Sequence, residues 1–145
     1  MNNRKATRAS LMRSIGELRD ALVYDRGEEC TLLPDGKAVG ICTNSARYLK
    51  SIVGGLVVGY DLSENPTAEI GVAESGHDFL LLEHFVVDIW AAEIYGTPPV
   101  VRRSRAKLIR RLYGDSAQWR VWRRGRFEKL PPKHISRDRA SPPAR

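Results

Sequence analysis

The sequence predicts an α+β fold in which helices at the N-terminus pack on a small, mainly antiparallel sheet. Apolar residues recur at helical spacing through the first third of the chain, whereas short apolar runs bounded by turn residues fill the middle. Strands that follow helices without strict alternation are typical of antiparallel rather than parallel sheets. The length of 145 residues and the 42% hydrophobic content suit one globular domain, which we expect over residues 1–129.

Two helices are expected ahead of the sheet. The first spans about Ala6 to Tyr24, because charged residues separate apolar side chains at helical intervals there. The second lies in "GICTNSARYLKSIVGG", where one of the three polar residues after Cys42 can cap the start and the Gly54–Gly55 pair ends the helix.

Four strands are expected next, in "LVVGYDL", "TAEIGVAE", "HDFLLL" and "FVVDIW". A two-residue turn at Glu83–His84 joins the last two strands into a hairpin and leaves His84 exposed at its tip. This turn sets Leu80 opposite Val87. It also sets the residue before Leu80 opposite Asp88, which interrupts the second strand.

The remainder of the chain is predicted to hold a basic helix and one more strand. The helix lies in "VVRRSRAKLIRRLYG", and "QWRVWRRGRF" alternates as a short strand with Trp119 and Val121 on one face. Residues 130–145 have few apolar side chains and four prolines. We therefore expect a disordered, basic, proline-rich tail.

The composition argues against a membrane protein, a disulfide scaffold and a metalloprotein. No apolar run approaches the ~20 residues of a membrane helix, and the basic N-terminus lacks the apolar core of a signal peptide. We expect a cytoplasmic protein, with export by a signal-independent route left open. The two cysteines, Cys30 and Cys42, and the three histidines, His77, His84 and His134, lack the spacing of a zinc site. No metal or organic cofactor is expected.

The positive charge is concentrated in the last third of the chain. Residues 1–100 carry 9 Lys and Arg against 14 Asp and Glu, a net charge of −5, whereas residues 101–145 carry 15 against 3, a net charge of +12. A predicted basic patch holds six of these cations: Arg102, Arg103, Arg105, Lys107, Arg110 and Arg111.

This basic patch has three interpretations. Trp119 and Trp122 follow it and would allow base stacking in a nucleic-acid site, but no recognition motif is present. We favour a solvated helix face, or a surface for an acidic protein partner, over specific nucleic-acid binding.

Asp88 is the residue that most needs a functional explanation. A carboxylate in an apolar strand costs roughly several kcal/mol if it is unpaired. In the predicted hairpin His77 lies on the same face as Asp88, diagonally across the strands and roughly 7–8 Å away between backbones. A carboxylate on one imidazole nitrogen fixes the tautomer and favours the imidazolium, so the other nitrogen can exchange a proton.

Cys42 is the candidate nucleophile for this pair. It stands at or just before the first turn of the second predicted helix, where the partial positive charge of a helix N-terminus stabilises a thiolate. A nucleophile, a base and a group that orients the base are the three parts of acyl-transfer chemistry. Cys42, His77 and Asp88 supply these three parts. Each alone is more often structural, and only their combination indicates a catalytic site.

These segments resemble the core of the transglutaminase-like cysteine hydrolases, which belong to the papain-like group. The resemblance spans about Val39 to Ala91 and rests on "GIC" opening a helix, "LVVGYDL" as the next strand, then "GHDF" and "FVVDIW". It implies Cys42 as nucleophile, His77 as general base and then general acid, and Asp88 as the orienting group. It also implies that no cofactor is needed.

The sequence departs from the family's pattern after the histidine and before the cysteine. Asp78 and Phe79 follow the histidine where the family usually has a small residue and Trp, and no Gln precedes Cys42 to complete an oxyanion hole. The backbone N–H of Cys42, with a donor from the Asp35–Lys37 loop, could serve instead. Phe79 and Trp90 can line the substrate cleft or fill the core, and Asp78 can support the site or face solvent.

Two hypotheses of function follow. The first is a thiol-dependent amide hydrolase, of the protease or glutamine deamidase type, that forms an acyl-enzyme on Cys42 and acts on a protein or peptide. Attack by an amine would give transglutaminase-type acyl transfer instead, and the small size would suit an effector or toxin. The second is a non-catalytic module that binds a protein or a nucleic acid through the basic patch.

Overall fold

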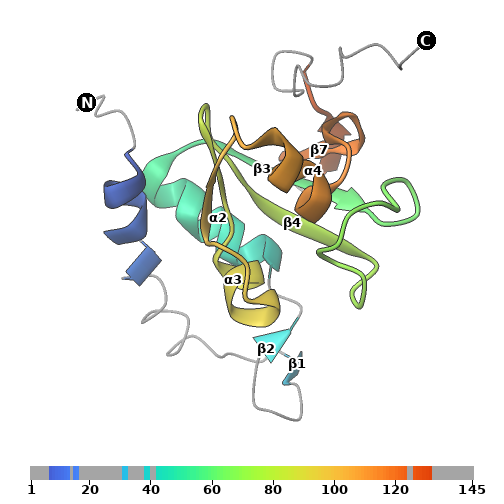
Figure 1. Ribbon diagram of the computed structural model, residues 1–145, viewed down its shortest axis with the longest axis horizontal. Helices are drawn as coiled ribbons and strands as arrows, with labels where there is room; N and C mark the ends of the chain where they lie inside the picture. Colours follow the sequence, from blue (N-terminus) through green and yellow to red (C-terminus); the bar gives the residue numbers. More distant parts are fainter. Residues whose placement is uncertain are drawn as a thin grey trace.

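The structure, a computed structural model, describes residues 7–13, 15–16, 31–32, 38–39, 42–123 and 126–131. It confirms an α+β fold, with a sheet in which neighbouring strands pair antiparallel in the order β6-β5-β4-β3-β7-β8 (Figure 1). Its strands are β3 (Leu56–Asp61), β4 (Gly76–Leu81), β5 (Phe85–Val87), β6 (Val100–Arg102), β7 (Arg120–Arg123) and β8 (Arg126–Lys129). A separate two-stranded sheet pairs β1 (Thr31–Leu32) with β2 (Ala38–Val39).

The helices with full bounds are α2 (Cys42–Val53), α3 (Ile89–Tyr95) and α4 (Ala106–Tyr113), followed by a 3₁₀ turn, η1, at Ser116–Gln118. Residues 8–13 and 15–16 are also helical, and the rest of the predicted first helix lies outside the described residues. Among the helices that the structure describes, none is both long enough and apolar enough to cross a membrane.

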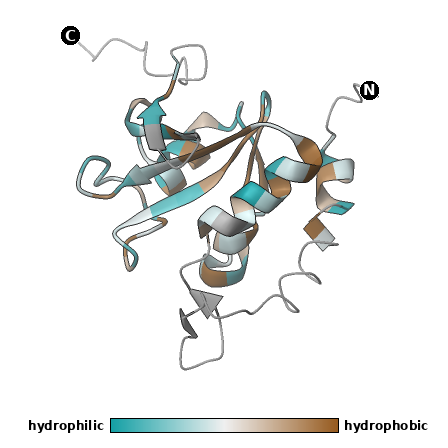
Figure 2. Ribbon diagram, turned by 180° about the vertical axis from the view of Figure 1, so that it is seen from behind, coloured by the Kyte–Doolittle hydropathy of each residue, from teal (hydrophilic) through white to brown (hydrophobic). Residues whose placement is uncertain are grey.

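The sheet carries an apolar core on each face, because successive side chains of a strand point to opposite sides. Figure 1 shows α2 and α4 on different sides of the long β3–β4 pair, and Figure 2 shows the hydrophobic residues gathered along the central strands. The α4 side buries Val58, Phe79, Leu81, Leu112 and Tyr113. The α2 side buries Leu11, Ile15, Leu49, Leu80 and Val87.

The predicted β4–β5 hairpin is confirmed in its register but not in its length. Leu80 pairs with Val87 as predicted, and the Leu82 N–H donates to the Phe85 carbonyl across the Glu83–His84 turn, at 2.8 Å. The placement of Asp88 in the second strand was wrong, because β5 ends at Val87 and Asp88 is the N-cap of α3. Its carboxylate accepts a backbone N–H of the new helix, which a strand would not offer.

The strand predicted in "TAEIGVAE" is also wrong, because residues 62–75 form a series of turns. Gly71 has a φ of +92° and Ser75 a φ of +65°, which lie outside the β region of a regular strand. The backbone of this loop instead hydrogen-bonds to the end of α4. The N–H groups of Glu69 and Ile70 donate to the carbonyls of Arg111 and Leu112 at 3.2 and 3.0 Å.

The C-terminal third holds more strand than predicted. The residues Val100–Arg102 form β6 beside β5, so the basic helix begins only at Ala106. The segment predicted as one strand contributes to two paired strands, β7 and β8. Of the predicted tail, residues 132–145 lie outside the described residues, whereas Leu130 is buried in the core on the α4 side.

Candidate active site

A short strand creates the space in which the site is built. β5 pairs with β4 only through Leu80–Val87 and Leu81–Val86, so the first residues of β4 have no β5 partner. The chain leaves the sheet after Val87 and turns into α3, whose first residues take the place beside His77. The loss of the predicted strand therefore brings Asp88 closer to His77 than a continued ladder would.

Asp88 is a buried carboxylate with three hydrogen-bond partners. Its Oδ1 accepts the Ala91 N–H at 3.0 Å, and its Oδ2 lies 2.5 Å from the His77 Nε2. The same Oδ2 accepts the hydroxyl of Tyr113 at 2.9 Å. Each partner has an N–H or O–H group that can donate to the carboxylate. These hydrogen bonds offset the desolvation cost of burying its negative charge. Asp88 thus starts a helix and fixes the imidazole at the same time.

His77 is buried among aromatic rings. It is 3% exposed, and the ring centroids of Trp90, Phe79, Tyr113 and Tyr60 lie 5.1, 5.9, 6.2 and 6.4 Å from its own. Burial alone would lower the pKa of His77, but the charge and the hydrogen bond of Asp88, together with the Cys42 thiol, raise it above its ordinary value. The site therefore favours the imidazolium form.

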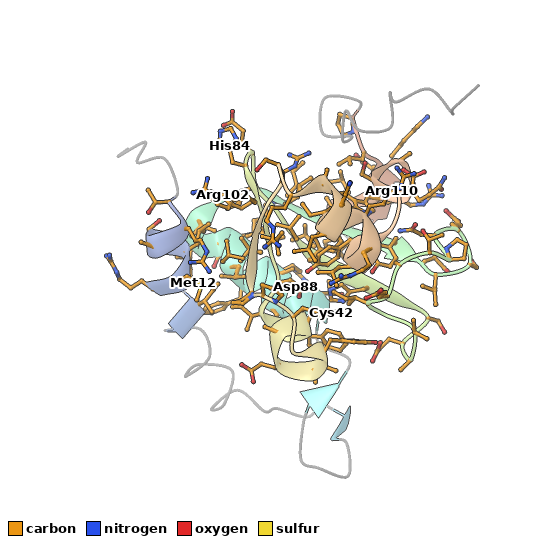
Figure 3. The ribbon with its side chains drawn as sticks, viewed as in Figure 1. Met12, Cys42, His84, Asp88, Arg102 and Arg110 are labelled. Carbon is orange, nitrogen blue, oxygen red and sulfur yellow. The ribbon has the colours of Figure 1, made fainter. Side chains whose placement is uncertain are left out.

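Cys42 is the first residue of α2 and is partly buried, with its side chain packed against the core on the α4 side. Cys42 lies near enough to His77 to contribute to the raised pKa of the imidazole. The His77 Nδ1 is buried and has no well-formed hydrogen bond among the described residues. Since Nε2 is held by Asp88, Nδ1 is the nitrogen left for the thiol. Figure 3 shows Cys42 and Asp88 together above α3, with His84 at the far end of the strands.

Asp78 lies on the opposite face of β4 from His77 and does not face solvent freely. Its carboxylate accepts the hydroxyl of Thr43, the residue after Cys42. Burial raises the pKa of Asp78, and the Thr43 hydrogen bond and the charge on His77 partly offset that rise. Gly59 is directly opposite on β3, where an added Cβ would come within 1.8 Å of the Asp78 Oδ1. The missing side chain at Gly59 thus makes room for a contact that anchors the first turn of α2.

The two aromatic residues considered for the cleft have different roles. Phe79 is 1% exposed and packs on Tyr113 and Trp119, with ring centroids 4.5 and 5.0 Å away, so it belongs to the core. Trp90, 6% exposed, lies in the first turn of α3 against His77 and Tyr95. Its indole Nε1 is buried without an acceptor among the described residues, which leaves an N–H donor unused beside the imidazole.

Sequence reasoning missed Tyr113 and Tyr60, and it considered Thr43 only as a possible helix cap and not as a partner of Asp78. Tyr113 reaches Asp88 across 25 positions of sequence, and the Thr43–Asp78 pair spans 35. Tyr60 donates its hydroxyl to the Ile70 carbonyl at 2.6 Å, and burial raises its pKa above the ordinary range. Of these three residues, only Tyr113 had a position in the sequence that could have indicated a role, because it comes just before Gly114, which ends the basic helix.

The remaining predicted residues lie apart from this site. His84 is exposed at the hairpin tip beside Glu83, as predicted, with 3.6 Å between the imidazole and the carboxylate. Cys30, His134 and the Asp35–Lys37 loop fall outside the described residues. Within the described ranges there is no group of three or more His, Cys, Asp or Glu side chains that could hold a metal ion.

The predicted basic patch is divided between two places. Arg102, on β6, stacks on the Phe85 ring at 5.3 Å, and Arg103 donates to the carbonyls of Leu82 and Glu83 at 3.2 Å each. Burial lowers the pKa of Arg103. Its guanidinium binds the β4–β5 turn and does not belong to an exposed basic surface. The other four cations lie at the start of α4 and along it: Arg105, Lys107, Arg110 and Arg111. Figure 3 shows Arg102 and Arg110 on separate parts of the molecule.

Comparisons with protein-family models, curated proteins and solved structures give no significant match.

Proposed function

We propose that this protein is a thiol-dependent amide hydrolase that acts through Cys42, His77 and Asp88. One observation carries the proposal: a buried imidazole is fixed by a carboxylate on Nε2, while its unbonded Nδ1 is left for a thiol at the start of a helix. A structural histidine would be expected to use both nitrogens, because a buried polar atom without a partner is costly.

We further propose that the fold is a compact variant of the papain-like or transglutaminase-like core. Three features support this: the thiol begins a helix, that helix packs on an antiparallel sheet, and the histidine is the second residue of a strand. The helical residues Leu11 and Ile15 pack on the same face as α2. A further departure from the resemblance, beyond those in the sequence, is that Asp88 caps a helix instead of lying in the next strand.

The reaction would begin with the transfer of the Cys42 proton to the Nδ1 of His77, whose positive charge Asp88 stabilises. The thiolate attacks the carbonyl carbon of the amide and forms a carbon–sulfur bond. His77 then donates its proton to the leaving nitrogen as the carbon–nitrogen bond breaks, which gives an acyl-enzyme and a free amine. Water then loses a proton to His77 and attacks the acyl carbon, the carbon–sulfur bond breaks to release the acid, and His77 returns its proton to the Cys42 sulfur.

The developing oxyanion needs hydrogen-bond donors. The backbone N–H of Cys42 is suited to this, because the first N–H groups of a helix have no acceptor within it. The unused indole N–H of Trp90 is a second donor beside His77. These two groups take the place of the Gln that the sequence lacks.

Hydrolysis is the preferred outcome, with a protein or peptide as substrate. Proteolysis and glutamine deamidation both proceed through a thioester on Cys42: in proteolysis a main-chain carbonyl is transferred and a peptide amine leaves, whereas in deamidation the side-chain carbonyl of Gln is transferred and ammonia leaves. Transglutaminase-type transfer to an amine is the alternative resolution of that intermediate, and mass analysis of the products would distinguish the three.

Alkylation by iodoacetamide across pH tests the proposal without knowledge of the substrate. In a Cys30→Ser background only Cys42 can react, and we expect labelling well below the pH at which ordinary thiols react, about 8.5. His77→Ala should remove this low-pH reactivity. His84→Ala is the matched control, because His84 is exposed at the hairpin tip and should leave the profile unchanged.

Turnover of an activated ester such as p-nitrophenyl acetate provides a second measurement. Cys42→Ser and His77→Ala should each lower the release of p-nitrophenolate by roughly 100-fold or more. The proposal is wrong if Cys42 reacts like a free thiol and His77→Ala leaves its rate unchanged.

A further inference from the structure

The outer face of α4 carries positive charge that the described structure does not neutralise. Lys107 and Arg110 are exposed on this helix, and Arg105 is exposed at its N-cap position. Among the described residues, these three cations have no carboxylate partner within ion-pair distance. Arg111 differs, since its Nε lies 3.7 Å from a carboxylate oxygen of Glu69.

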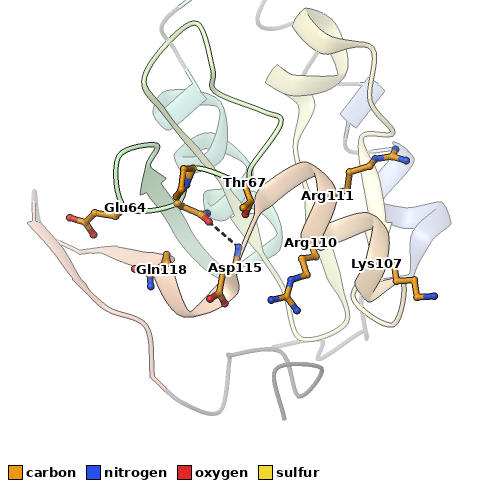
Figure 4. Close-up of a pocket in the computed structure, with 9 residues that line it drawn as sticks. Glu64, Thr67, Lys107, Arg110, Arg111, Asp115 and Gln118 are labelled. Atoms are coloured by element: carbon orange, nitrogen blue, oxygen red, sulfur yellow. Dashed lines mark hydrogen bonds between the residues drawn. The ribbon is translucent and has the colours of Figure 1, made fainter. Parts of the chain in front are cut away.

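Two hollows flank this helix and share Lys107, Arg110 and Arg111. One, of about 850 Å³, runs along residues 104–111. The other, of about 560 Å³, lies between α4 and residues 64–67 and is also lined by Asp115 and Gln118. Figure 4 shows Arg110 between Lys107 and Asp115 in this second hollow, with Glu64 and Gln118 on the opposite wall.

The carboxylates in this hollow are already engaged. Glu64 accepts a hydrogen bond from the Arg120 guanidinium, and Asp115 accepts the Ala117 N–H at 3.0 Å. Neither one is paired with Lys107 or Arg110. The wall is also held in place, because the Asn65 amide donates to the Tyr113 carbonyl and its oxygen accepts the Asp115 N–H, both at 2.9 Å. The hollow is thus a fixed shape with two unneutralised cations.

We infer that this face of α4 binds an acidic segment of a protein partner. Spaced carboxylates of such a segment would pair with Lys107 and Arg110. The Thr67 hydroxyl and the Gln118 amide, which line the same hollow, are suited to hydrogen bonds with a peptide backbone. The inference does not depend on catalysis, because none of these residues belongs to the proposed active site.

Two observations favour an acidic peptide over a nucleic acid. Single-stranded nucleic acids stack their bases on exposed aromatic rings, but Trp119 is 2% exposed and its indole N–H donates to the Tyr113 carbonyl at 2.9 Å. The exposed large hydrophobic residues of the described structure line neither hollow: Met12, Tyr48, Ile52 and Val72. Glu64 and Asp115 would also repel a continuous phosphate backbone. A peptide whose carboxylates are spaced apart can place an uncharged residue beside each of them.

Fluorescence anisotropy tests the inference with two probes of equal net charge: a labelled peptide of alternating glutamate and glycine, and a labelled oligothymidylate. We expect the peptide to bind the full chain at low ionic strength and more weakly at physiological ionic strength. The double variant Lys107→Glu/Arg110→Glu should lower its affinity about tenfold or more. Cys42→Ser should bind as the wild type does, so failure of the proposed catalysis would leave this result intact.

The chain offers a matched control in Arg47→Glu/Lys50→Glu. Arg47 and Lys50 are one arginine and one lysine, exposed and three positions apart on α2, as Lys107 and Arg110 are on α4. The control pair makes the same change in net charge and should alter affinity less than about twofold, with circular dichroism confirming that both variants fold. Equal losses in the two variants would overturn the inference, and so would tighter binding of the oligothymidylate or no peptide binding at low ionic strength.

Discussion

The hydroxyl of Tyr113, at the end of the basic helix α4, donates a hydrogen bond to the Oδ2 of Asp88 at 2.9 Å. This oxygen is the same one that holds the His77 Nε2, so the helix whose cations Lys107 and Arg110 have no carboxylate partner among the described residues also supports the proposed catalytic carboxylate. Tyr113 is fully buried, and the Asp88 charge adds to burial in raising its pKa well above the ordinary range. The hydroxyl therefore remains a donor.

The loss of this hydroxyl should destabilise the fold measurably. We expect Tyr113→Phe to lower the free energy of unfolding by about 1–2 kcal/mol, because Asp88 loses a donor in a buried position. Urea unfolding followed by circular dichroism would measure it. Tyr48→Phe, at an exposed position on α2, is the matched control and should change the value by less than about 0.5 kcal/mol. Equal effects at the two positions would show that the hydroxyl of Tyr113 has no special role.

The His77–Asp88 pair should make stability depend on pH. The pKa of His77 is raised in the folded state, so the folded protein holds a proton that the unfolded chain releases above about pH 6.5. The stabilisation is therefore complete below about pH 6.5. It falls by up to about 1.4 kcal/mol per pH unit until the pH passes the folded pKa.

Urea unfolding at a series of pH values, in a Cys42→Ser background that removes the thiol's own titration, would measure this slope. Asp88→Asn should abolish it, because burial then dominates and lowers the pKa of His77. His84→Ala should retain it. A slope that survives Asp88→Asn would assign the effect to another group, such as Asp78, whose raised pKa acts with the same sign from about pH 4 upward.

Position 59 should tolerate only glycine, because the Asp78 side chain occupies the space opposite it. An added Cβ would lie 1.8 Å from the Asp78 Oδ1 and 2.8 Å from the His77 carbonyl. We expect Gly59→Ala to cost about 2–3 kcal/mol in the free energy of unfolding. Gly16→Ala, where the added Cβ would meet no atom within 4 Å, should change it by less than about 1 kcal/mol.

A double-mutant cycle would show how much of this cost belongs to Asp78. Asp78→Ala should relieve part of the Gly59→Ala penalty, with a coupling of about 1 kcal/mol, while the backbone clash at His77 remains. Strictly additive effects would mean that Asp78 moves away at no cost and does not anchor α2.

Trp90 should matter for turnover more than for the reactivity of the thiol. Trp90→Phe keeps a ring beside His77 but removes the indole N–H, which has no acceptor among the described residues. If this N–H stabilises the oxyanion, turnover of p-nitrophenyl acetate should fall about 100-fold, while iodoacetamide labels Cys42 at an unchanged rate. A parallel fall in both rates would instead indicate that the substitution displaces His77.

Much of the site could be read from local patterns. The helix that begins at Cys42, the strand that follows it and the Glu83–His84 turn each depend on residues close together in sequence, and each was predicted. The same turn placed His77 and Asp88 within reach of one another. The structure brings them to 2.5 Å through a different route, because Asp88 caps α3 after β5 has ended.

The sequence by itself determined the α+β class, the register of the central hairpin and the proximity of His77 to Asp88, because these follow from periodicity and turn chemistry over short spans. Only the tertiary structure decided where β5 ends, which hydroxyls satisfy Asp88 and Asp78, and which cations remain unpaired. These features depend on contacts between residues 25 or more positions apart, for which a single sequence gives no local signal.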